Sequence, residues 1–324
     1  MACSTPSPRP RASEVNETEA ITRLRRIATN PAARGLLDDA ALLEGLVITH
    51  DSIAEGVHYL PGDPPESVGW KLAAVNASDL AAKGAKPLAA LLSLSLTGDD
   101  EWDLRFLDGL EAALAEFDMD LVGGDTIALG NKSPRVLGLT AIGRAAPKTP
   151  SRAGGCEGDL LWLVGTLGDS AAGLARLLSD SDAQGPLVEA YRRPQPLLAA
   201  GAVLAAHATA MMDVSDGLLL DVTRLAGASG VSAQIDLTNL PLSDAFIAER
   251  GDDVDARLFA ATGGDDYALL LSLSDGLDPF TLSLPGKITI TAIGRLGRGS
   301  GISLTSSGEP VPLPERLGHE HCPV

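Results

Sequence analysis

The sequence predicts an α+β fold in two domains, and three observations lead to this prediction. The chain has 324 residues, which is longer than a single hydrophobic core usually supports. Its residues are 45% hydrophobic but only 3% aromatic, so we expect cores of Ala, Leu, Val and Ile. Strand-like and helix-like stretches mix without the strict alternation of a doubly wound sheet, and the pattern restarts after residues 145–158, which are rich in Pro, Gly and Ser.

In the first half of the chain, apolar residues repeat at helical or strand spacing in a series of stretches. For the second helix, Ser67 is the expected N-cap, and Gly84 followed by Pro87 ends the element. Asn76 and Asp79 are three residues apart on this helix, so their side chains point to one face. The expected helices cover residues 14–28, 67–83 and 101–117, and the expected strands cover residues 46–49, 88–96, 120–122 and 136–142.

A second series follows the linker. The glycine-rich stretch at 294–299 comes after a strand and is expected to be a turn. The first 13 residues are expected to form a disordered tail, which leaves domains at residues 14–146 and 147–324. The expected helices of the second domain cover residues 170–178, 196–207 and 217–228, and its strands cover residues 160–164, 231–235, 267–273 and 288–293.

Composition excludes several classes of function. The formal net charge is −18, and such a field repels nucleic acid and anionic lipid. The three cysteines lack metal-ligand spacing, so neither a zinc site nor a disulfide framework is expected. The N-terminus has no apolar signal-peptide core, and the longest apolar stretch, residues 197–212, is too short to span a membrane. We therefore expect a cytoplasmic protein that binds neither nucleic acid nor membrane.

Aspartates recur beside glycine or small polar residues at the ends of apolar runs. Any one such segment is ordinary turn chemistry, but their number suggests carboxylates gathered from many loops onto one site. Carboxylate oxygens are the ligands that Mg²⁺ prefers, and Mg²⁺ usually binds together with substrate phosphates. The pattern therefore predicts a phosphoryl-transfer enzyme. The segments are residues 36–41, 49–51, 76–79, 123–126, 213–217 and 263–267.

The common kinase signatures are missing, because the chain has neither a P-loop nor the motif set of protein kinases. Other motifs take their place: GWKLAAVNASDLAAKGA at 69–85, LVGGDT at 121–126, DVSDGL at 213–218, GTLGDSAAGL at 165–174, EGVHY at 55–59 and GGDDY at 263–267. Their order resembles that of the thiamine-monophosphate kinases, which belong to the superfamily of aminoimidazole ribonucleotide synthetase. The resemblance covers roughly residues 19–294, most of the chain.

This resemblance implies a two-domain aminoimidazole ribonucleotide synthetase-like fold, with N-terminal strands that pair across a homodimer. It implies ATP-dependent phosphorylation of thiamine monophosphate to thiamine diphosphate, by direct in-line transfer assisted by several Mg²⁺ ions. No protein nucleophile is needed, because the acceptor phosphate is already ionised at neutral pH and the metals neutralise the reacting oxygens.

The resemblance also implies roles for individual residues. Residues 14–146 would be the ATP- and metal-binding domain, and residues 147–324 the C-terminal α+β domain. The implied metal ligands are Asp39, Thr49, Asp51, Asp79, Asp125, Asp213 and Asp216. The implied ATP-binding residues are Gly124, Asp125, Arg152 and Ser215, and the implied substrate-binding residues are His58 and Asp265.

This chain departs from the family pattern at four of the positions near these residues. Leu37 stands where the family has a glycine before a metal ligand, and His50 where it has Thr or Ser. Ile127 replaces a Thr after the Gly-Gly-Asp motif, and Asp265 replaces a Glu. No Trp lies near the C-terminus, where the family places an aromatic ring against its substrate.

Two alternatives follow. The first is another ATP-dependent enzyme of the superfamily, such as the hydrogenase-maturation dehydratase or selenophosphate synthetase. Those enzymes need a C-terminal or a loop cysteine, whereas Cys322 is not terminal and Cys3 lies in a Pro/Ser tail. The second is a non-catalytic nucleotide-binding homologue, which the departures at Leu37, His50 and Asp265 would explain.

Overall fold

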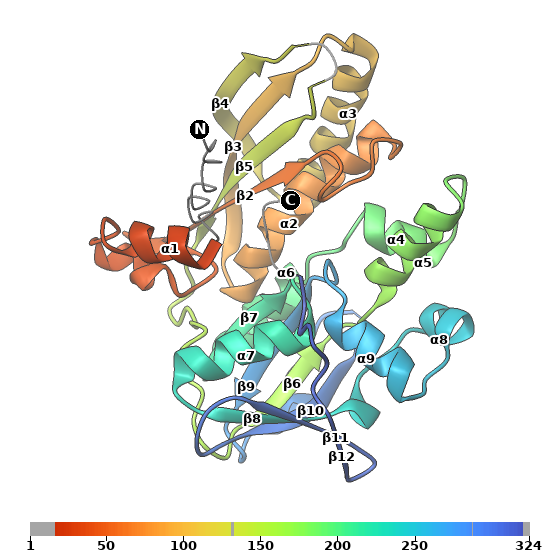
Figure 1. The fold of residues 1–324 in the computed structure, drawn as a ribbon. Helices are drawn as coiled ribbons and strands as arrows, with labels where there is room; N and C mark the ends of the chain where they lie inside the picture. The colour runs from red at the N-terminus through yellow and green to blue at the C-terminus, as the bar shows by residue number, and fades with distance from the viewer. Residues whose placement is uncertain (1–16, 131–132, 287, 320–324) are drawn as a thin grey trace, which may run out of the picture.

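A computed structural model describes residues 17–130, 133–286 and 288–319. It contains two sheets, each covered by its own helices, and the helix α2 (Pro65–Ala82) lies where the two halves meet (Figure 1). The mixed order of helices and strands confirms the α+β prediction. The expected tail at residues 1–13 lies outside the described residues.

The first sheet has five strands, and helices α2 and α3 (Asp100–Glu116) pack on it (Figure 1). Its strands are antiparallel except for the parallel pair at one edge, β3 with β4. Nearly every residue of α2 is buried, because the helix packs between this sheet, α3 and the second half of the chain. In sheet order the strands are β1 (Ala41–Leu43), β2 (Leu46–Ala54), β5 (Val136–Arg144), β3 (Lys86–Leu96) and β4 (Asp120–Ala128). Helix α1 (Glu17–Arg25) and a 3₁₀ helix (Pro31–Leu36) precede them.

The second sheet has seven strands and is antiparallel except where β11 runs parallel to β8. Its edge strand β7 is buried along its whole length and contacts α2. In sheet order the strands are β12 (Glu309–Val311), β11 (Ile302–Ser306), β8 (Ser232–Asp236), β10 (Ile290–Gly297), β6 (Leu160–Val164), β9 (Ala268–Leu273) and β7 (Ala210–Val214). The helices are α4 (Asp169–Ser179), α5 (Pro186–Arg192), α6 (Leu198–Leu204), α7 (Leu218–Ser229), α8 (Asp244–Arg250) and α9 (Val254–Thr262), with 3₁₀ turns at Leu237–Asn239 and Pro279–Thr281.

Three strand ends lie further along the chain than expected. Strand β2 continues through His50 to Ala54, because it pairs with β5 over all nine of its residues. Strand β4 continues through the Gly-Gly-Asp motif to Ala128, because it pairs with β3 up to that residue, with one irregularity at Val122. The predicted turn at 294–299 is in part the end of β10, which pairs with β8 as far as Gly297. In each case, pairing with a neighbouring strand overrides the local turn signal.

The helix predictions need two corrections. Ser67 is not an N-cap: α2 starts two residues earlier, after Pro64, and the Ser67 hydroxyl donates back to the Pro64 carbonyl at 2.7 Å. The helix expected at 196–207 is the shorter α6. The predicted end of α2 is confirmed, because Lys83 is its C-cap and Gly84 takes a left-handed φ of 59°. No helix among the described residues has the length and apolarity needed to cross a membrane.

Candidate active site

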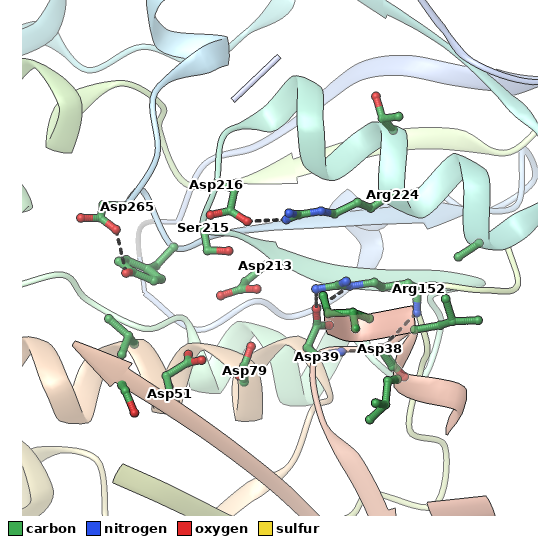
Figure 2. A pocket seen from close by; sticks show the side chains of 18 of the residues that line it. Asp38, Asp39, Asp51, Asp79, Arg152, Asp213, Ser215, Asp216, Arg224 and Asp265 are labelled. Carbon is green, nitrogen blue, oxygen red and sulfur yellow. Dashed lines mark hydrogen bonds and ion pairs between the residues drawn. The ribbon is translucent and has the colours of Figure 1, made fainter. Parts of the chain in front are cut away.

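A cavity of about 670 Å³ lies between the two halves of the molecule, within the usual size range of ligand sites. Figure 2 shows Asp265 at one end of it, Asp79 and Asp213 in the middle, and Arg152 and Arg224 towards the other end. Acidic, basic and apolar side chains thus line different parts of one elongated site.

Three carboxylates meet at the middle of this cavity. Asp39 follows the 3₁₀ helix, Asp79 projects from α2, and Asp213 comes from β7 in the second sheet. Each offers an oxygen atom, and these atoms lie within 4.8 Å of one another. Asp213 is only 3% exposed and accepts a hydrogen bond of 2.6 Å from Ser78 of α2. The group therefore depends on the packing of α2 against the second half of the chain.

Burial and mutual repulsion make Asp79 and Asp213 hard to ionise. Burial raises the pKa of Asp213 to about 8, and Asp39 adds to this shift. Burial likewise raises the pKa of Asp79 well above its usual value, with Asp51 and Asp213 adding to the effect. Asp51 is exposed to the cavity, but protein atoms surround its carboxylate on the other sides. The resulting desolvation raises the pKa of Asp51 as well. Such a cluster is stable in the ionised form only if cations neutralise it.

The donor set fits divalent magnesium. All three converging groups are carboxylates, the hard oxygen ligands that Mg²⁺ binds. The Asp39 Oδ2 atom is buried and accepts no well-directed hydrogen bond, although the Lys83 ammonium lies 2.5 Å away as an ion-pair partner. Asp39 Oδ2 is therefore neutralised by an ion pair, while its geometry leaves it available to a competing cation.

The remaining predicted metal ligands divide into two groups. Asp51 and Asp216 line the same cavity as the three central carboxylates, and Ser215 lies beside Asp216. Thr49 does not line the cavity: its hydroxyl donates to the Asp79 carboxylate and lies 3.3 Å from the Asp39 carbonyl. Thr49 therefore orients Asp79 from behind.

One end of the cavity brings together both predicted substrate residues. His58 and Asp265 line it, and Lys71 of α2 joins them: its ammonium donates to Asp265 Oδ2 at 2.6 Å and to the His58 carbonyl at 2.9 Å. The Tyr267 hydroxyl donates to the other Asp265 oxygen at 2.9 Å. The His58 Nδ1 accepts from the Ala54 amide at 3.0 Å, so the neutral ring carries its proton on Nε2. The end is thus preorganised before any ligand binds.

The opposite end is basic and partly apolar. Arg152 donates to Asp39 Oδ1 at 2.6 Å, which places the predicted ATP-binding arginine beside the carboxylates. Arg224 of α7 pairs with Asp216, and also with Asp221 at 2.9 Å. The apolar part of this end is formed by Ile21, Leu36, Leu37, Gly227 and Ala228.

Two predicted site residues lie elsewhere in this chain. Gly124 and Asp125 belong to the exposed edge strand β4 and do not line the cavity. Gly124 is needed for strand pairing, because a Cβ atom there would lie 2.0 Å from the Leu92 carbonyl oxygen.

The structure explains two of the departures from the family pattern. The left-handed turn before Asp39 lies at Arg34, Gly35 and Leu36, whereas Leu37 has an ordinary φ of −114° and needs no glycine. The His50 ring lies on the exposed face of the first sheet, 2.9 Å from the Thr140 hydroxyl, and not in the cavity. Neither residue displaces a carboxylate.

Sequence reasoning missed several residues of the site. Lys71 and Lys83 lie within the long motif at 69–85, but nothing in their spacing indicated the carboxylates that they contact. Asp38 precedes Asp39 and pairs with Lys83 and Arg34, both at 2.5 Å. The signal available was the presence of two lysines in a motif where Ala, Leu and Val predominate.

Comparisons with known proteins agree with this geometry. Residues 37–145 match the family model "AIR synthase related protein, N-terminal domain", and residues 157–277 match the C-terminal domain of the same family. The chain is 36% identical to the thiamine-monophosphate kinase of Caulobacter vibrioides, over 96% of this chain and 92% of that protein. The chain belongs to the thiamine-monophosphate kinase family.

Other members of the family support the same assignment. The thiamine-monophosphate kinase of Escherichia coli strain K12 is 36% identical over 89% of this chain and 91% of its own length. The solved structure "AaThiL complexed with AMPPCP and TMP" superposes with a TM-score of 0.82 at 31% identity, covering 97% of this chain and all of that one. The hydrogenase maturation protein HypE in complex with ATP shares the fold alone, at 19% identity and a TM-score of 0.66.

Proposed function

We infer that this chain catalyses the ATP-dependent phosphorylation of thiamine monophosphate to thiamine diphosphate. The observation that carries this inference is the convergence of Asp39, Asp79 and Asp213 between a basic end and an acceptor end of one cavity. Family membership at 36% identity over nearly the whole chain supports the same reaction.

We propose that Mg²⁺ ions bind at the central carboxylates, with Asp39, Asp79 and Asp213 as ligands and Asp51 and Asp216 as further ligands. When bound, these ions would neutralise the phosphate oxygens that must approach one another. Thr49 and Ser78 hold Asp79 and Asp213 by hydrogen bonds, so the ligand positions are set before binding.

The two ends suggest where the two substrates bind. Arg152 and Arg224 lie on one side of the carboxylates and suit the polyphosphate of ATP, with the apolar surface of α1 and α7 beside them. Ser215 lies next to Asp216, close to Asp213, where it would contact the phosphates nearest the metals. His58 and Asp265 lie on the other side and suit thiamine monophosphate. No side chain is needed as a base, because a phosphate oxygen is the nucleophile.

We propose that Asp125 reaches the site only in a homodimer. Strand β4 is exposed at every position, and Leu121, Val122 and Ile127 expose between 51% and 61% of their surface on it. An exposed apolar edge strand of this length favours pairing with another chain. Pairing of the N-terminal strands across a dimer would cover this edge and bring Gly124 and Asp125 to the partner's cavity.

The His319 amide donates to the Asp216 carbonyl at 2.8 Å, so the C-terminal segment passes close to the site. We further propose a cytoplasmic enzyme with its domain boundary at residues 146–147.

A turnover assay tests the reaction. Purified protein with Mg·ATP should release ADP only when thiamine monophosphate is present, and thiamine diphosphate should appear in equal amount. ADP release without an acceptor, or binding of Mg·ATP with no turnover on thiamine monophosphate, would overturn the proposal. The second result would favour the non-catalytic homologue.

Mixing two inactive variants tests the dimer. Asp79→Asn and Asp125→Asn should each be inactive, but after subunit exchange about a quarter of wild-type activity should return, since half of the dimers then have one intact site. If both residues act within one chain, mixing would restore nothing.

A further inference from the structure

Lys83 is a fully buried lysine next to the predicted metal ligands. It is the C-cap of α2 and only 1% exposed. Its ammonium lies 2.5 Å from Asp38 Oδ1, 2.5 Å from Asp39 Oδ2, and 3.1 Å from the Met211 carbonyl of β7. The lysine therefore connects three parts of the chain below the cavity.

The charges around Asp39 differ from those around its neighbours. Three cations surround Asp38 and Asp39, namely Lys83, Arg34 and Arg152. In contrast, no Lys or Arg of residues 17–130, 133–286 and 288–319 forms an ion pair with Asp79 or Asp213, which accept from the hydroxyls of Thr49 and Ser78. Fixed protein cations thus neutralise only one side of the carboxylate group.

Lys83 occupies the oxygen that a metal ion would need. Asp39 Oδ2 is the buried atom without a well-directed hydrogen bond, and the Lys83 ammonium is its close neighbour. The lysine cannot withdraw easily, because its side chain is 1% exposed and its ammonium also donates to the Met211 carbonyl at 3.1 Å. Asp79 lies one helical turn before Lys83 on the same face of α2.

We propose that Lys83 is an internal cation that takes the place of a divalent metal at Asp39. It holds the acidic site together when no metal is bound, and it weakens metal binding by competing for Asp39 Oδ2 and by repelling the incoming ion. Lys83 is therefore a positioning residue that determines the metal concentration at which the site fills. The inference rests on the proposed metal-dependent function.

The test compares Lys83→Met with the wild type in two measurements. Calorimetry measures the binding of Mn²⁺ in the absence of nucleotide, and thermal unfolding is followed with and without chelator. The matched control is Lys71→Met, which removes a second buried lysine of α2 that contacts none of the central carboxylates. We expect Lys83→Met to unfold at a lower temperature than the wild type in chelator and to bind Mn²⁺ at least tenfold more tightly. Saturating Mn²⁺ should raise the melting temperature of Lys83→Met by more than it raises that of the wild type. Lys71→Met should bind Mn²⁺ like the wild type.

A purely structural role for Lys83 predicts the opposite sign, because a disordered Asp39 would bind metal more weakly. Unchanged or weaker Mn²⁺ binding by folded Lys83→Met would overturn the inference while leaving the wild-type metal site intact. Absence of Mn²⁺ binding by the wild type would overturn both this inference and the proposed metal site. If Lys83→Met does not fold in chelator, the charge-balanced double variant with Asp38→Asn replaces it, and the same increase in Mn²⁺ affinity is expected.

Discussion

Replacement of Asp213 by Asn should stabilise the metal-free protein against unfolding. The same replacement should abolish the activity that the protein has with Mg²⁺. Asp213 is 3% exposed, lies within 4.8 Å of Asp39 and Asp79, and has a pKa raised to about 8 by burial. The folded protein is destabilised either by the repulsion between these charges or by the uptake of a proton. Asn removes both effects and still offers an oxygen to the Ser78 hydroxyl.

The magnitude follows from the geometry. Two unit charges 4.8 Å apart repel by about 3 kcal/mol at an effective dielectric constant of about 20. Removal of the Asp79–Asp213 pair should therefore raise the free energy of unfolding of the metal-free protein by up to about 3 kcal/mol, or the melting temperature by about 5 °C. If Asp213 is a metal ligand as proposed, its loss should lower turnover by orders of magnitude, because bound metals would supply most of the transition-state stabilisation.

Thermal unfolding in chelator and in saturating Mg²⁺, together with steady-state kinetics, measures both effects. In chelator, Asp213→Asn should melt at a higher temperature than the wild type. Saturating Mg²⁺ should raise the melting temperature of this variant by less than it raises that of the wild type. The control is Asp118→Asn, which removes the same charge at a side chain 81% exposed and should change neither quantity. An Asp213→Asn variant that is less stable in chelator, or that turns over like the wild type, would refute the reasoning.

Three further predictions concern the ends of the cavity and pH. Lys71→Met should raise the KM for thiamine monophosphate at least tenfold and leave the KM for ATP within twofold of the wild-type value. Lys71→Arg should keep part of the affinity for thiamine monophosphate. A change in the KM for ATP alone would contradict this prediction. Asp265→Glu should lower the KM for thiamine monophosphate by restoring the longer family side chain, and calorimetry that finds weaker binding would count against it. Burial raises the pKa of Asp213 to about 8 and that of Asp221 to about 7, so the folded metal-free protein holds more protons than the unfolded chain. Its free energy of unfolding should therefore fall as pH rises from about 4 to 8. Saturating Mg²⁺ should remove the part of this slope that Asp213 causes and leave the part from Asp221, which pairs with Arg224 and does not line the cavity. Denaturant titrations that show no slope without metal would disprove the prediction.

Local sequence patterns were sufficient for most elements. The apolar runs predicted strands near β3 and β6 and helices near α3, α4 and α7, because a 2- or 3.6-residue period reflects hydrogen bonding within the element. The motif at 69–85 placed Asn76 and Asp79 on one helix face, and the structure has both on α2. Recurrent aspartates predicted a carboxylate site, and Asp39, Asp79 and Asp213 do converge.

Only the tertiary structure decided how these residues combine. The sequence could not show that β2 and β4 continue past their aspartates, because strand length depends on the partner strand. Nor could it show that Lys83 contacts Asp38 and Asp39 across 45 and 44 positions, or that Asp125 lies on an exposed edge away from the cavity. Residue type and spacing determine which chemistry the side chains can perform. Which of them meet depends on strand order and on the packing of α2 against the second sheet, and these arise from contacts between residues far apart in the chain.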